Sequence, residues 1–76
     1  MTNSIETFPE LIKEVRRQLG ISQEELAHEL GVSFATINRW ENGKTTPFKL
    51  ARGHFDDFCN KMSAAKKLDL TEWIEG

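Results

Sequence analysis

The sequence predicts an all-α fold, a compact bundle of four to five helices. Three observations predict it: apolar residues recur at steps of three and four, capping residues precede these runs, and the alternation typical of strands is absent. With 76 residues, 38% of them hydrophobic and 29% charged, the composition is that of one globular domain spanning residues 1–76. So short a chain has a small core, and we expect tightly packed helices, a partner subunit or both.

The first helix is predicted over residues 8–19. Thr7 can accept a hydrogen bond as its N-cap, and Pro9 lies in the first turn, where a missing N–H costs little. Gly20 follows as a left-handed stop. One apolar stripe runs along this helix and consists of Phe8, Leu11, Ile12, Val15 and Leu19.

The second helix has the clearest start signal. Ser22 and Glu25 have the S-x-x-E spacing of a capping box, in which each side chain accepts a hydrogen bond from the other residue's backbone. Gly31 ends the helix after about two turns. Because isolated helices of this length are unstable in water, packing must hold this one, and its inward-facing residues are Leu26, Ala27 and Leu30.

A second serine cap, Ser33, starts the third helix, which is predicted to run to Asn42 before Gly43 stops it. Ile37 and Trp40 lie three residues apart and share the face that we expect to be buried. The remaining face is polar and holds few acidic residues.

The fourth helix is predicted to begin at Thr46 and Pro47, a capping residue followed by a proline. Gly53 weakens this helix slightly because glycine has more conformational freedom to lose. The apolar stripe of the fourth helix consists of Ala51, Phe55, Phe58, Cys59 and Met62.

The segment after Ser63 has two interpretations. Asp69 and Glu72 have the spacing of another capping box, ahead of Trp73 and Ile74. These two large apolar residues either belong to a fifth helix that completes the core or pack against a second copy across a two-fold axis. Residues 63–76 are therefore a candidate contact for a dimer or another partner.

Residues 22–42 combine the features of a helix-turn-helix. Ala27 is small enough for the next helix to cross closely, and Gly31 lies in the turn, where a positive φ is needed. Ile37 and Trp40 then anchor the third helix to the core. Two short helices joined by a turn of about three residues form the unit that places its second helix in the major groove of DNA.

The segment ISQEELAHELGVSFATINRWENGK, residues 21–44, followed by Pro47, resembles the Cro/CI-type helix-turn-helix proteins of phage repressors, also called the XRE family. The resemblance covers roughly residues 11–58. It implies a five-helix DNA-binding domain, usually dimeric on palindromic operators, and an ion pair between Arg16 and Glu41 that ties the first helix to the end of the third. Phe34 and Ala35 depart from the polar pair often found there in the family, and the chain from Asp56 onward matches no specific family pattern.

The third helix offers the polar face that the major groove can admit. Arg39 can donate both arms of its guanidinium to guanine O6 and N7, and Asn38 can pair with adenine or reach a phosphate. Phe34 either contacts a thymine methyl or is buried against the second helix. The predicted base contacts are Ser33, Phe34, Ala35, Thr36, Asn38 and Arg39.

Phosphate contacts are expected on both sides of this helix, where they position the protein without reading sequence. The N-terminus of the second helix, which Gln23 opens, points free N–H groups outward, and the resemblance implies the same use of this glutamine. The residues just after the third helix resemble a second phosphate clamp of the family. The predicted phosphate contacts are Gln23, Asn42, Lys44, Thr45, Lys49 and Arg52.

The distribution of charge agrees with a DNA partner although the net charge is −2. Residues 33–55 hold four basic residues and one acidic residue, Glu41, whereas residues 18–32 hold three glutamates and neither lysine nor arginine. A local positive patch can attract phosphate whatever the net charge is.

Catalysis, metal binding and a cofactor are not expected. His28, His54 and Cys59 are the only residues of their kinds, and no phosphate-binding loop, zinc-protease motif or cysteine pair occurs. Cys59 is expected to be a small core residue. No apolar run approaches the roughly 18 residues of a membrane span, and no signal-peptide pattern opens the chain, so we expect a cytoplasmic protein without membrane contact.

The predicted function is sequence-specific binding of double-stranded DNA by a homodimeric transcription regulator, most simply a repressor, on a palindromic operator. Two copies on half-sites about 34 Å apart would double the contacts of one small domain. The alternative is an antitoxin that binds its own operator and neutralises a toxin or other protein partner through residues 63–76. A helix-turn-helix kept for protein contacts alone is a further rival, which a weak salt dependence of DNA affinity would favour.

Overall fold

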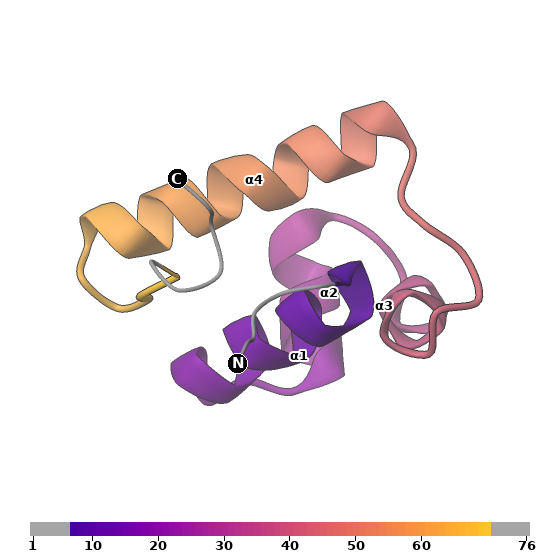
Figure 1. Cartoon of the computed structure of the whole chain (residues 1–76), viewed down its shortest axis with the longest axis horizontal. Coiled ribbons are helices and arrows are strands. Elements are labelled where there is room, and N and C mark those ends of the chain that lie inside the picture. The colour runs from indigo at the N-terminus through magenta and orange to yellow at the C-terminus, as the bar shows by residue number, and fades with distance from the viewer. Residues whose placement is uncertain (1–6, 71–76) are drawn as a thin grey trace.

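The computed structural model describes residues 7–70, and this part of the chain forms four α-helices and no strand. The helices are α1 (Phe8–Leu19), α2 (Gln23–Leu30), α3 (Phe34–Glu41) and α4 (Lys49–Ala64). Figure 1 shows the long α4 along one side of the molecule, with α1, α2 and α3 grouped on its other side. The prediction of an all-α fold is confirmed. Within residues 7–70, no helix has the length and hydropathy needed to cross a membrane.

The first three helices begin where their capping residues predict. The hydroxyl of Thr7 accepts from the backbone N–H of Glu10 at 3.4 Å. Both bonds of the predicted capping box form, since Ser22 Oγ accepts from Glu25 N at 3.0 Å and Glu25 Oε1 accepts from Ser22 N at 2.8 Å. The serine cap of α3 is present as well. Local side-chain chemistry therefore fixes these three starts.

Glycine in the left-handed region ends α1 and α2, as predicted. Gly20 has φ 67° and Gly31 has φ 70°. This left-handed backbone conformation is strained for residues that carry a Cβ atom and is readily adopted by glycine. The last residue of α3 is Glu41, one residue earlier than predicted, because Asn42 takes the C-cap position and Gly43 follows with φ 73°.

The predicted start of α4 at Thr46 and Pro47 is wrong. The helix begins at Lys49, with Phe48 in extended geometry at the N-cap and no side chain capping it. Residues 42–48 instead form the connection that carries the chain from the end of α3 to the near end of α4 (Figure 1). Proline disfavours helical geometry in the residue before it, so Thr46 and Pro47 suit this extended connection equally well.

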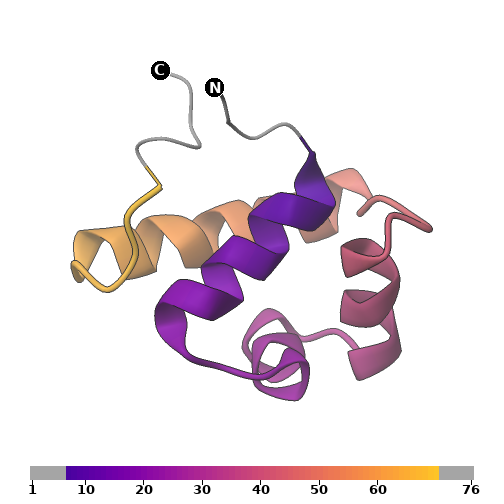
Figure 2. The same cartoon turned by 60° about the horizontal axis from the view of Figure 1, so that its bottom comes forward.

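The buried apolar residues form a single core between the helices. In the turned view of Figure 2, α1 crosses in front of α4, and α2 and α3 lie together on one side of α1. Ala27 is 4% exposed where α2 packs against α3, in agreement with the close crossing predicted for it. The core residues are Ile12, Val15, Leu26, Ala27, Leu30, Ile37, Trp40, Phe55, Phe58, Cys59, Leu68 and Leu70.

The chain after α4 turns back onto the core. Lys66 adopts φ 62°, and the backbone N–H groups of Lys66 and Lys67 donate to carbonyls of the last turn of α4. This reversal brings Leu68 and Leu70, each 5% exposed, against the helices. The predicted capping box at Glu72 and the interpretations of Trp73 and Ile74 lie outside the described residues.

Candidate nucleic-acid interface

The orientation of α3 follows from its two faces. Ile37 and Trp40, at 0% and 3% exposure, face the core. The ring of Phe8 packs edge-on against Trp40 with 5.7 Å between ring centroids, which fixes α3 against the start of α1. At the first turn, Ser33 Oγ accepts from Thr36 N at 3.1 Å and shares a 2.9 Å hydrogen bond with the Thr36 hydroxyl.

The opposite face of α3 is open to solvent. Ser33, Ala35 and Arg39 are exposed, and Thr36 is partly exposed. Phe34 is 50% exposed and is therefore available for contact, although the sequence left burial against α2 open. Five of the six residues predicted to touch bases therefore lie on this open face, which runs from the N-cap Ser33 to Arg39 in the last turn of α3.

Three basic side chains stand free around this face. Among residues 7–70, the side chains of Arg39, Lys44 and Lys49 form neither an ion pair nor a hydrogen bond within the protein, and all three are exposed. No acidic residue occurs from Asn42 to Phe55. The connection after α3 is consequently a positive surface on which Thr45 is also exposed.

Arg52 lies differently from these cations. Its Nε donates to Asp56 Oδ1 at 3.0 Å, and its guanidinium carbon lies 4.9 Å from the centroid of the Phe8 ring. The first contact lies within α4, and the second connects α4 to the start of α1. A phosphate contact by Arg52 would therefore have to compete with a carboxylate that is already in place.

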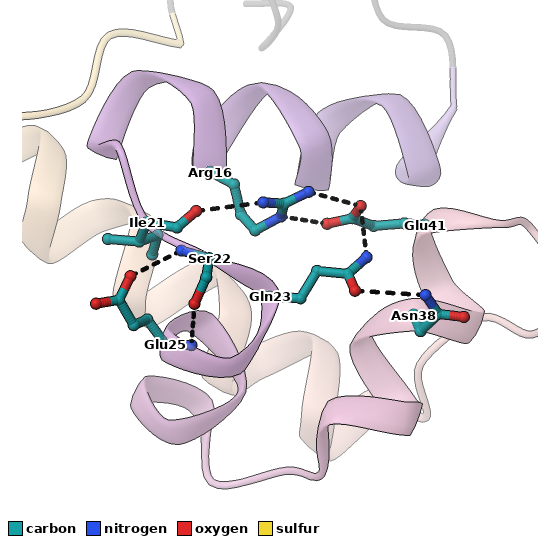
Figure 3. A network of polar contacts seen from close by, with 7 residues as sticks. All are labelled: Arg16, Ile21, Ser22, Gln23, Glu25, Asn38 and Glu41. Carbon is teal, nitrogen blue, oxygen red and sulfur yellow. Dashed lines mark hydrogen bonds and ion pairs between the residues drawn. The ribbon is translucent and has the colours of Figure 1, made fainter.

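Arg16 and Glu41 come together as the resemblance implied. Arg16 Nε donates to Glu41 Oε2 at 2.6 Å, a second guanidinium nitrogen donates to Oε1 at 3.0 Å, and the third reaches the carbonyl of Ile21 at 3.2 Å (Figure 3). Glu41 is 5% exposed. Burial alone would raise the pKa of Glu41, but the hydrogen bonds from Arg16 and Gln23 together with the nearby positive charges hold that pKa below its ordinary value.

The ion pair continues into a chain of amides that the sequence analysis missed. Gln23 Nε2 donates to Glu41 Oε1 at 3.0 Å, and Gln23 Oε1 accepts from Asn38 Nδ2 at 3.3 Å (Figure 3). Asn38 Oδ1 in turn accepts from Asn42 Nδ2 at 3.0 Å. Three predicted DNA contacts, Gln23, Asn38 and Asn42, are thus joined to one another and to the ion pair. Gln23 lies 15 residues from Asn38 and 18 residues from Glu41 along the chain, so these two links gave no local signal.

No group of three or more histidine, cysteine, aspartate or glutamate side chains suited to a metal ion occurs within residues 7–70. Cys59 is 7% exposed, and burial, with the nearby carboxylate of Asp56, raises its pKa to about 12. The thiol is therefore protonated at neutral pH and serves as core volume, as predicted.

Comparison with known proteins agrees with this geometry. Residues 12–47 match the model of a helix-turn-helix family. This match supports the predicted resemblance: residues 12–47, a little under half of the chain, are similar to a helix-turn-helix family, a class of DNA-binding domains. No solved structure matches the chain.

Two curated relatives share part of the sequence. The type II methyltransferase M1.ScrFI of Lactococcus lactis subsp. cremoris is 49% identical over 43 residues, 53% of this chain and 11% of that protein. An uncharacterized HTH-type transcriptional regulator of Methanothermobacter thermautotrophicus is 49% identical over 37 residues, 49% of this chain and 54% of that protein. The chain spans about half the length of the second relative and a small part of the first, so a name such as methyltransferase does not transfer to it.

Proposed function

We propose that the domain binds double-stranded DNA with α3 in the major groove and regulates transcription. The observation that carries this proposal is the open face of α3, which ends in the unpaired Arg39 and is followed by a stretch of chain without acidic residues that holds Lys44 and Lys49. A groove about 12 Å wide admits one helix, and the free cations that follow α3 can meet the phosphates beside it. The relative described as an HTH-type transcriptional regulator supports the regulatory role.

The proposed contacts with DNA are of two kinds, to bases and to phosphates. Residues of the open face read bases: Arg39 through guanine, and Phe34 and Ala35 through thymine methyl groups, beside the hydroxyls of Ser33 and Thr36. The second kind positions the domain on the phosphates and consists of Gln23, Asn42, Lys44, Thr45 and Lys49.

The regulator acts as a homodimer on a palindromic operator, and repression follows from occupying that site. One α3 of eight residues reads only a few base pairs, whereas two copies on half-sites about 34 Å apart read twice as many. The antitoxin alternative needs residues 63–76 to engage a partner. In their described part, Leu68 and Leu70 are already buried in the domain's own core, so the structure favours the regulator.

Selection of bound sequences from a pool of random duplexes tests the function directly. We expect an enriched palindrome whose affinity falls steeply as salt concentration rises, because phosphate contacts release counterions. An unenriched pool, or binding that salt does not weaken, would remove DNA recognition as the function of this surface.

Arg39→Ala is expected to weaken binding to the selected site by about 5- to 150-fold, the range of one bidentate contact with guanine. Binding to random duplex should fall only a few-fold, because that binding depends on charge alone. Fluorescence anisotropy with both duplexes at one salt concentration measures the two losses. Equal losses on both would make Arg39 a phosphate contact.

Lys44→Ala is expected to weaken selected and random duplexes alike. It should also reduce the slope of log affinity against log salt concentration by about one unit, since one phosphate neutralisation is lost. Titrations at several salt concentrations measure the slope, with Lys61→Ala, an exposed lysine of the last turn of α4, as the matched control. An unchanged slope for Lys44→Ala would take this lysine out of the contact surface.

A further inference from the structure

Asn38 has both ends of its amide engaged within the protein. Its Nδ2 donates to Gln23 Oε1 at 3.3 Å, and its Oδ1 accepts from Asn42 Nδ2 at 3.0 Å. An asparagine that reads adenine uses the same two groups, donating to N7 and accepting from the N6 amino group on the major-groove edge of the base. Asn38 is therefore held in place by two internal hydrogen bonds and keeps only one hydrogen and one lone pair for a base, whereas the neighbouring Arg39 side chain forms no hydrogen bond within residues 7–70.

The orientation of the Gln23 amide is determined by Glu41. A carboxylate only accepts hydrogen bonds, so the group of Gln23 that faces Glu41 at 3.0 Å must be the NH₂. The carbonyl oxygen of Gln23 then faces α3 and requires a donor there, which Asn38 Nδ2 supplies (Figure 3). Rotating the amide by half a turn would place oxygen against carboxylate and NH₂ against NH₂.

This arrangement leaves one hydrogen of the Gln23 NH₂ group without a partner in the hydrogen-bond chain, since each amide nitrogen carries two. Gln23 is the first residue of α2, where the free backbone N–H groups of the helix also point outward. A phosphate at this helix end would meet a side-chain donor whose direction is already set before DNA arrives.

We propose that Asn38 is a positioning residue, which holds the Gln23 amide in the orientation that donates to a DNA phosphate and reads no base itself. This inference rests on the proposed DNA-binding function and assigns Asn38 a different task from the base contact that the sequence predicts. It follows that loss of Asn38 weakens binding to every sequence equally and acts only while Gln23 is present.

A double-mutant cycle tests the assignment with four proteins: wild type, Asn38→Ala, Gln23→Ala and the double variant. In the wild-type background, Asn38→Ala should lower affinity about three- to tenfold, the range of one hydrogen bond, on selected and random duplexes alike. In the Gln23→Ala background, it should have no further effect beyond about twofold. Asn60→Ala, an exposed asparagine of α4, is the matched control and should leave affinity unchanged.

Two results of the cycle would overturn the assignment. If Asn38→Ala causes the same loss with and without Gln23, Asn38 does not act through Gln23. If the loss is confined to duplexes carrying one particular base pair, Asn38 reads that base. Circular dichroism of each variant at the titration temperature ensures that a loss of affinity does not reflect unfolding.

A measurement without DNA separates this inference from the proposed function. The side-chain NH₂ signals of Gln23 in nuclear magnetic resonance spectra should shift and exchange faster in Asn38→Ala, and should stay in place in Asn60→Ala. Unchanged Gln23 signals in Asn38→Ala would overturn the positioning role even if the protein binds DNA. Shifted signals in a protein that binds no duplex would support the hold of Asn38 on Gln23 and refute the DNA-binding function alone.

Discussion

Trp40→Ala is expected to remove most of the folding free energy of the protein at room temperature. Trp40 is 3% exposed on the inner face of α3 and contacts the Phe8 ring, which itself packs edge-on against Phe55 at 5.2 Å between centroids. Truncating a buried tryptophan costs about 3–5 kcal/mol, including the cavity that it leaves. Natural domains of this size are stable by only about 5 kcal/mol, so little folding free energy would remain.

Urea unfolding followed by circular dichroism at 222 nm measures this loss, since that signal reports helix content independently of the tryptophans. Trp40→Phe should lose clearly less stability than Trp40→Ala, because an aromatic ring remains against Phe8. Phe48→Ala is the matched control: Phe48 is 85% exposed, and the loss of its side chain should change stability by less than about 0.5 kcal/mol. A Trp40→Ala protein with the wild-type unfolding midpoint would refute the role of Trp40 as the core anchor of α3.

The starts of α1, α2 and α3 were predictable because their signals are local. A serine or threonine caps a helix through a backbone N–H only three residues away, as Ser22 and Ser33 do here. A left-handed glycine likewise acts within one turn of the helix that it ends. These helix ends can be predicted from the sequence because the groups that interact there lie within a few residues of one another.

The start of α4 was not predictable from the same kind of signal. Thr46 and Pro47 satisfy the local rule for a helix start, yet the helix begins at Lys49. Residues 42–48 span the distance from the end of α3 to the near end of α4, and α4 must be placed so that Phe55 enters the core at 1% exposure. Both requirements are set by tertiary packing and therefore leave no mark in a window of a few residues.

The chain after α4 shows a similar limit. Lysine occupies the left-handed position at φ 62° where a glycine would have signalled a turn, so Leu68 and Leu70 carried no sign that they return to the core. The return is held from a distance: Gln18 Nε2 donates to the carbonyl of Asp69 at 2.9 Å and Gln18 Oε1 accepts from Asp69 N at 2.7 Å. These residues are 51 positions apart along the chain.

The candidate site likewise has features that local sequence spacing predicts and features that depend on tertiary contacts. The open face of α3 was predictable, because the spacing of Ile37 and Trp40 fixes which residues face inward. The pairing of Arg16 with Glu41 came from the family resemblance. The link from Gln23 to Asn38 needed coordinates, since it depends on the angle at which α2 and α3 cross.

Arg16→Ala is expected to destabilise the domain by about 3 kcal/mol at pH 7, because it leaves the carboxylate of Glu41 buried without its cation. The neighbouring Arg17→Ala is a matched control. Arg17 pairs with Glu14 at 2.6 Å but is 71% exposed, so solvent screens the pair and its loss should cost clearly less than the loss of Arg16. Urea unfolding of both variants measures the contrast, and equal losses would show that burial of Glu41 carries no penalty.

The cost of Arg16→Ala should also shrink in acid. In the wild type, the pKa of Glu41 lies below its ordinary value of 4.5, so its contribution to stability is present above about pH 4.5 and is lost as pH falls through the lowered pKa. In the variant, burial without the guanidinium raises the pKa of Glu41, and protonation at low pH removes the unpaired charge. The difference in stability between the wild type and Arg16→Ala should therefore narrow between pH 7 and pH 4.

The double variant Arg16→Met/Glu41→Leu should recover most of the loss of stability at pH 7, because apolar side chains can replace a buried pair. If the stability difference between the wild type and Arg16→Ala stays constant with pH, Arg16 stabilises the junction of α1 and α3 by packing rather than by charge.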